Sequence, residues 1–190
     1  MERLILAAIA AMGLFSVGTA RGVAIWDGEA GDGFWTNPVN WVANTPPVSG
    51  EHIFITNGNS VILPVGTLPN ACTVTVSGAS TLTASAGVVR LAGSTINVTT
   101  GTLAGGWWDM GGGKMFFEDG AAATMGTLEH KGNNTFGFKL SPTGFQKLTP
   151  GAIRFASTAW SNMTYNIDAS MYNVSNGTTV VLMDYTSAGD

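Results

Sequence analysis

Short runs of alternating apolar and small polar residues fill the middle of the chain. In the run 72–77, Val74 and Val76 alternate with threonine and serine, so a strand there would carry both valines on one face. Glycine, asparagine or proline ends each run, and the next run follows after roughly 7–12 residues, which is too short for a crossover helix. The pattern predicts hairpins or the coils of a β-solenoid, with strands at 52–56, 60–63, 72–77, 81–83, 88–91 and 95–99.

Strand-like runs continue in the second half of the chain. The alternation in 164–168 places Tyr165 and Ile167 on an inward face. The glycine-rich stretch 101–113 predicts a bulged or sharply turned loop. Inside it, Trp107 and Trp108 are neighbours and would face opposite sides of a strand. No helix is predicted after residue 20, and the later strands are expected at 114–118, 135–140, 152–155, 164–168 and 179–183.

The first 20 residues have the pattern of an export signal. A short charged start precedes an apolar run at 4–15, and small residues up to Ala20 fit a signal-peptidase site. A membrane anchor is the alternative, but the run is shorter than the ~20 apolar residues that span a bilayer. We therefore expect signal removal, no later membrane span, and a secreted or cell-surface location.

Residues 21–50 differ in composition from the strand-rich part. Trp26, Trp35 and Trp41 lie among glycine, aspartate and asparagine, which favour tight turns. Three large aromatic side chains can cover the open end of a stacked β core, so this segment is expected to be an N-terminal cap. The predicted organisation is a signal at 1–20, a Trp-rich cap at 21–50, a β-solenoid at 51–145 and a β-rich extension at 146–190.

Composition agrees with a β-rich exported protein. Only 11% of residues are charged, against about 25% in typical domains, so threonine, serine, asparagine and glycine must cover the surface. The formal net charge is −4 and basic runs are lacking, so nucleic acid is not an expected partner. The single cysteine, Cys72, is expected at an outward or edge position of its strand, as a small residue and not a nucleophile.

Several short motifs near the N-terminus carry a resemblance. Trp26-Asp-Gly is followed by a Gly-Asp-Gly-Phe-Trp motif ending at Trp35, then Asn40-Trp41, two prolines, and an Ile-Phe-Ile-Thr-Asn-Gly strand ending at Gly58. This opening resembles the autotransporter-associated β-strand repeat proteins, passenger-type secreted bacterial proteins that often carry a C-terminal sorting tag. The resemblance implies a structural role without catalytic residues, and we expect the chain to be the front part of a longer protein.

Candidate chemistry is sparse. Asp27, Glu29 and Asp32 form a compact acidic set that is a weak calcium candidate, with Asp-Gly turn formation as the alternative. Trp107 and Trp108 are the candidates for stacking on a sugar ring, although both could instead be packed. Glycan cleavage would need two facing carboxyl groups, and the acids available for it are Glu118, Asp119 and Glu129.

The fold expected from these features is all-β: an irregular right-handed parallel β-helix or solenoid, with a Trp-rich N-terminal cap and a β-sandwich-like C-terminal extension. The expected function is that of a non-enzymatic exported surface or matrix segment, used for adhesion or display. The alternative is an extracellular protein that binds carbohydrate or cleaves polysaccharide. Extracellular glycans or cell-surface components are the expected partners, and no cofactor is expected.

Overall fold

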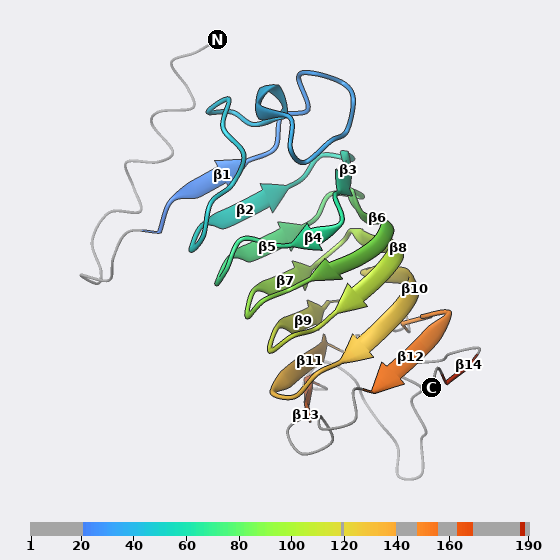
Figure 1. The fold of residues 1–190 in the computed structure, drawn as a ribbon. Helices are drawn as coiled ribbons and strands as arrows, with labels where there is room; N and C mark the ends of the chain where they lie inside the picture. The colour runs from blue at the N-terminus through green and yellow to red at the C-terminus, as the bar shows by residue number, and fades with distance from the viewer. Residues whose placement is uncertain (1–20, 119, 140–147, 156–162, 169–186, 189–190) are drawn as a thin grey trace.

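The computed structural model describes residues 21–118, 120–139, 148–155, 163–168 and 187–188. In these residues the chain winds into an all-β parallel solenoid of about four turns, without an α-helix (Figure 1). Every pairing between named strands is parallel, so the runs are coils of a solenoid and not hairpins. The predicted parallel β-solenoid is confirmed.

Two stacked sheets hold the strands. The first sheet contains, in spatial order, β1 (Val23–Ile25), β2 (His52–Ile55), β5 (Thr73–Val76), β7 (Thr95–Val98), β9 (Lys114–Phe117), β11 (Asn134–Lys139) and β13 (Met163–Asp168). The second contains β14 (Ser187–Ala188), β12 (Ala152–Phe155), β10 (Ala122–His130), β8 (Thr102–Asp109), β6 (Thr81–Arg90) and β3 (Ser60–Leu63), and β4 (Gly66–Thr67) also pairs with β6. A 3₁₀ turn, η2 (Pro38–Asn40), lies in the N-terminal segment.

Successive coils of the solenoid differ in length. The strands of the first sheet are aligned at one register position, and 19 to 22 residues separate consecutive partners as far as β11. The step from β11 to β13 is longer, at 29 residues. The variable spacing agrees with the irregular repeat expected from the sequence. The aligned residues are His52, Thr73, Thr95, Lys114, Thr135 and Thr164.

Three strands of the second sheet, β6, β8 and β10, are long and bend midway (Figure 1). In β6 the register with β8 shifts between Ala84 and Val88, and in β8 the bend lies at Gly105 and Gly106, whose φ values are +70° and +38°. Residues 102–109 therefore form a strand with parallel partners on both sides, and the loop predicted at 101–113 is wrong. The glycines bend that strand without ending it.

Apolar side chains stack in columns along the inside of the solenoid. One column in the first sheet consists of buried residues from consecutive strands: Ile53, Val74, Ile96, Met115 and Phe136. Removing such a continuous column from water supplies the main stabilisation of stacked coils. The period-two alternation of the sequence thus identified the buried face of these strands.

The inward columns end at β13, the last described strand of the first sheet. Tyr165 aligns with Phe136, and their rings stack with centroids 6.0 Å apart. Ile167 aligns with Phe138. Their inward alignment agrees with the sequence prediction, but Tyr165 and Ile167 keep 46% and 52% of their surface exposed because no described strand covers them.

The three tryptophans of the N-terminal segment form a buried cluster at the other end. Trp41 packs edge-on against Trp26 and Trp35, with ring centroids 5.0 Å and 4.9 Å apart, and its Nε1–H donates to the Trp35 carbonyl. The Trp26 amide donates to the carbonyl of Phe54, and the Trp35 amide to that of Ile62. The cluster is thereby joined to the first coil on both sheets, as expected for a cap.

Two sequence-based expectations are corrected by the structure. Cys72 is only 1% exposed and precedes β5, where its amide donates to Ser94 Oγ and its thiol to the Val48 carbonyl, so the predicted outward position is wrong. Cys72 belongs to the buried hydrophobic cluster of the solenoid, and burial raises the pKa of its thiol. Beyond residue 145, β12, β13 and β14 pair parallel with earlier strands, so these described strands continue the solenoid in place of a sandwich.

Candidate functional site

Charged side chains align on the outer side of the second sheet. Arg90, Asp109, Glu129 and Arg154 are register partners on four consecutive strands, β6, β8, β10 and β12. The flanking positions Val89, Trp108 and Leu128 point into the core, so the charged column points outward. The structure thus collects residues that are about 20 positions apart in the sequence into one row, which we call the charged ladder.

Asp109 is the centre of the charged ladder. Asp109 is 1% exposed, and its carboxylate oxygen Oδ2 lies 3.2 Å from Arg90 Nε and 2.8 Å from Lys131 Nζ. Its Oδ1 accepts the backbone N–H of Gly111 at 3.1 Å. Both carboxylate oxygens are therefore occupied, and the arrangement ties three coils together.

Glu129 shares a cation with Asp109. Its Oε2 lies 3.1 Å from Lys131 Nζ, and the hydrogen bond from Lys131 to Asp109 is the main cause that raises the pKa of the lysine. Lys131 therefore bridges the two carboxylates of the charged ladder. The ladder was not predicted from the sequence, and the signal that could have found it is the coil-length spacing of Arg90, Asp109 and Glu129.

The two tryptophans singled out as sugar contacts lie in β8 with different environments. Trp108 has 0% exposure inside the core, and its Nε1–H donates to the Gly105 carbonyl. Trp107 faces outward and is partly buried. The guanidinium carbon of Arg154 lies 4.6 Å from the centre of a Trp107 ring, so a cation covers this aromatic face.

The acids considered for catalysis are distributed over different parts of the fold. Glu118 follows β9 of the first sheet and lines a groove there, whereas Glu129 belongs to β10 of the second sheet and binds Lys131. Asp119 lies outside the described residues. The groove beside Glu118 does not include Glu129, so these two do not form a facing pair.

The acidic set of the N-terminal segment shapes its turns. Asp27 Oδ1 accepts the amide of Glu29, and Asp32 accepts from the amide of Phe34 and the side chains of Asn37 and Asn40. The hydrogen bond from Asn37 is the main cause that lowers the pKa of Asp32. Over the part of the chain that the structure describes, no three histidine, cysteine or acidic residues are grouped to hold a metal ion.

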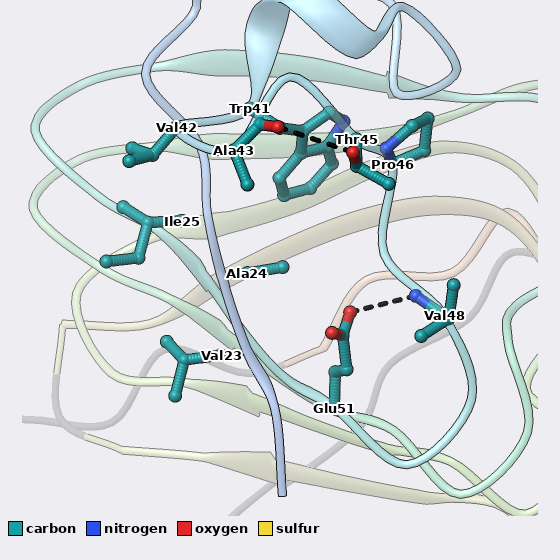
Figure 2. Close-up of a pocket in the computed structure, with 10 residues that line it drawn as sticks. All are labelled: Val23, Ala24, Ile25, Trp41, Val42, Ala43, Thr45, Pro46, Val48 and Glu51. Carbon is teal, nitrogen blue, oxygen red and sulfur yellow. Dashed lines mark hydrogen bonds between the residues drawn. The ribbon is translucent and has the colours of Figure 1, made fainter.

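A small apolar pocket lies beside the cap, between β1 and the loop 42–48 (Figure 2). Its volume is about 150 Å³, and Ala24 and Trp41 face it from β1 and the cap. The carboxylate of Glu51 accepts the amide of Val48 at 2.8 Å and so holds the loop. Figure 2 shows Val23 and Ile25 on the opposite side of β1 from Glu51. The pocket therefore offers apolar surface and one already occupied carboxylate.

His130 is the last residue of β10, lies in an inward column and is the register partner of Phe155 on β12. The amides of Leu68, Leu91 and Met110 donate to the carbonyls of Arg90, Asp109 and Glu129, and these bonds align Leu68, Leu91, Met110 and His130 in one column. His130 is 1% exposed and lies beside Phe136. Burial lowers the pKa of His130 from 6.5 to about 4. The neutral imidazole is the form that the folded protein prefers.

This burial predicts a pH-dependent stability. Because the unfolded state binds a proton between pH 6.5 and about 4 and the folded state does not, the free energy of unfolding falls as the pH is lowered through this range, by about 3 kcal/mol at most. Urea unfolding at several pH values measures it. In the His130→Gln variant, the part of the pH dependence that comes from His130 should vanish. Subtracting the free energies of unfolding of the two proteins cancels the contributions of the other titrating groups. Equal slopes for both proteins would contradict the assignment.

Within the described residues, no helix combines the length and the apolar character that crossing a bilayer requires. The comparisons with known proteins found no matching family model, no similar curated protein and no similar solved structure.

Proposed function

We propose that this chain is an exported segment of a passenger-type surface or matrix protein, and that it acts as a scaffold and not as an enzyme. Its coils would hold outer faces and loops in fixed positions outside the cell, for adhesion or display. The resemblance of the N-terminal motifs to autotransporter-associated β-strand repeat proteins supports this role, as does the signal-like pattern of residues 1–20.

The observation that carries the proposal is the division between inner and outer columns. The inner columns are apolar from coil to coil, which makes each coil a stacking unit. The outer columns of the first sheet contain small polar side chains, including Thr73, Thr75, Thr95 and Asn97. In the charged ladder, cations occupy the carboxylates of Asp109 and Glu129. Such an arrangement supports a rod with a polar surface.

An epitope inserted at a coil corner tests this role. Gly93 is exposed, and no atom lies within 4 Å of where a Cβ would be, so an insert of about ten residues after Gly93 should leave the unfolding midpoint unchanged. Antibody should then label intact bacteria that express the chain. The matched control is the same insert after Gly106, where a Cβ would lie 2.6 Å from Ala84 Cβ and folding should fail.

An epitope after Gly93 that antibody reaches only in lysed cells would contradict display. An equally well folded protein with the insert after Gly106 would contradict the packing of the coils on which the scaffold depends.

A further inference from the structure

A shallow groove lies on the outer side of the first sheet, across β9, β11 and β13. Its volume is about 240 Å³, and its lining includes Phe116, Glu118, Gly137, Lys139, Asn166 and Asp168. It is distinct from the charged ladder, which belongs to the second sheet. The groove combines an aromatic side chain, charged groups and an amide within a small space.

Phe116 forms the floor of this groove because the next strand offers a glycine. Phe116 and Gly137 are register partners, and a Cβ on Gly137 would overlap Phe116 Cδ1 and lie 2.7 Å from Cε1. The ring therefore covers the outward side of Gly137, which is buried, while Phe116 itself stays partly exposed. An aromatic ring that rests on the backbone with one side leaves its other side available to a ligand.

The outward column that contains Phe116 has both polar and aromatic members. The partners of Phe116 on earlier strands are Asn97, Thr75 and Phe54, and the partner of Gly137 on β13 is Asn166. Because the ring of Phe116 faces outward, it does not contribute to the core.

A row of charges forms one side of the groove. Lys139 and Asp168 are register partners on β11 and β13. Phe117 is the partner of Phe138, so the next residue, Glu118, lies level with Lys139. Glu118, Lys139 and Asp168 therefore lie in order across the three strands. The row has one positive and two negative groups, which offer both donors and acceptors to hydroxyl groups. Its net negative charge disfavours an anionic ligand.

We propose that this groove binds one pyranose ring of a neutral β-linked glucan. The apolar C–H face of the sugar would lie on Phe116, and its hydroxyl groups would bond to the row of Glu118, Lys139 and Asp168. Equatorial hydroxyl groups leave both faces of β-linked glucose apolar, which suits an aromatic floor. The volume is below the roughly 300–1,000 Å³ of sites for drug-sized ligands, which limits the occupant to about one ring.

Calorimetric titration of the purified chain with cellohexaose tests the site. We expect saturable binding, weakened about tenfold or more in Phe116→Ala and retained in Phe116→Tyr. Gly137→Ala should weaken it as well, because the added methyl group displaces the ring. Trp107→Ala is the matched aromatic control and should leave the affinity unchanged. Hexagalacturonate, the anionic counterpart, should bind at least about tenfold more weakly than cellohexaose.

Lack of binding by the wild-type chain would overturn the proposal, as would an unchanged affinity in Phe116→Ala or equal affinity for hexagalacturonate. If Gly137→Ala does not fold, Phe116→Ala still decides, since Phe116 lies on the outer face and its truncation opens no core cavity. The titration uses purified protein, so its result is independent of whether the chain is exported and displayed.

Discussion

Replacing Trp41 by alanine is expected to lower the free energy of unfolding by about 3–5 kcal/mol, the range for truncating a buried aromatic side chain. Trp41 is 1% exposed and contacts both other indoles of the cap, so its loss opens a cavity that neither Trp26 nor Trp35 can fill without giving up bonds to the first coil. Urea unfolding followed by circular dichroism measures the change.

Two variants serve as controls for the cap. Trp41→Phe keeps an aromatic ring but loses the 2.8 Å hydrogen bond to the Trp35 carbonyl, so an intermediate loss is expected. Val42→Ala changes a side chain that is 60% exposed and should shift stability by less than about 0.5 kcal/mol. If Trp41→Ala were as mild as Val42→Ala, the cluster would not be the cap of the core.

Replacing Asp109 by alanine should cost about 2–3 kcal/mol. The substitution removes the common acceptor of Arg90 and Lys131 and leaves the Gly111 amide without its carboxylate partner. The cost stays below that of breaking a fully buried ion pair, because both cations are partly exposed and regain water. Urea unfolding of the variant gives the value.

Asp27→Ala is the control for a carboxylate that only shapes an exposed turn, and it should cost less than about 1 kcal/mol. A double-mutant cycle should give a larger coupling of Asp109 with Lys131 than with Arg90, because Lys131 is nearer and also binds Glu129. An Asp109→Ala variant as stable as the wild type would show that the charged ladder does not hold the coils together.

The inner face of the solenoid follows from local sequence. In β5, Val74 and Val76 alternate with threonine, and the structure gives both valines 0% exposure. Period-two alternation acts within one strand and needs no knowledge of its neighbours, so it could be read directly. The same holds for the cap, because Trp26, Trp35 and Trp41 are large apolar side chains with few other places to be buried.

The outward sites depend on register, which the local pattern does not contain. Arg90, Asp109 and Glu129 appear as scattered charges until parallel pairing sets them one coil apart. The groove likewise requires Gly137 to be the partner of Phe116. Nothing within one strand gives that alignment, so neither the charged ladder nor the groove was predicted.

The glycine-rich stretch 101–113 shows where local preference misleads. Gly105 and Gly106 favour a turn, and by themselves they argue against a strand. In the folded chain β6 and β10 pair with β8 on either side, so tertiary pairing keeps the strand continuous and the glycines supply only its bend. Their positions are also crowded, since a Cβ on Gly106 would lie 2.6 Å from the Ser85 carbonyl oxygen.

The claim that this solenoid works outside the cytoplasm is tested most directly by the mature N-terminus. The full chain of 190 residues would be expressed in a bacterial host, and the mass of the protein from each compartment would be determined. The account predicts a protein that begins after Ala20 and is recovered from outside the cytoplasm. An uncut chain that begins at Met1 and stays in the cytoplasm would contradict it.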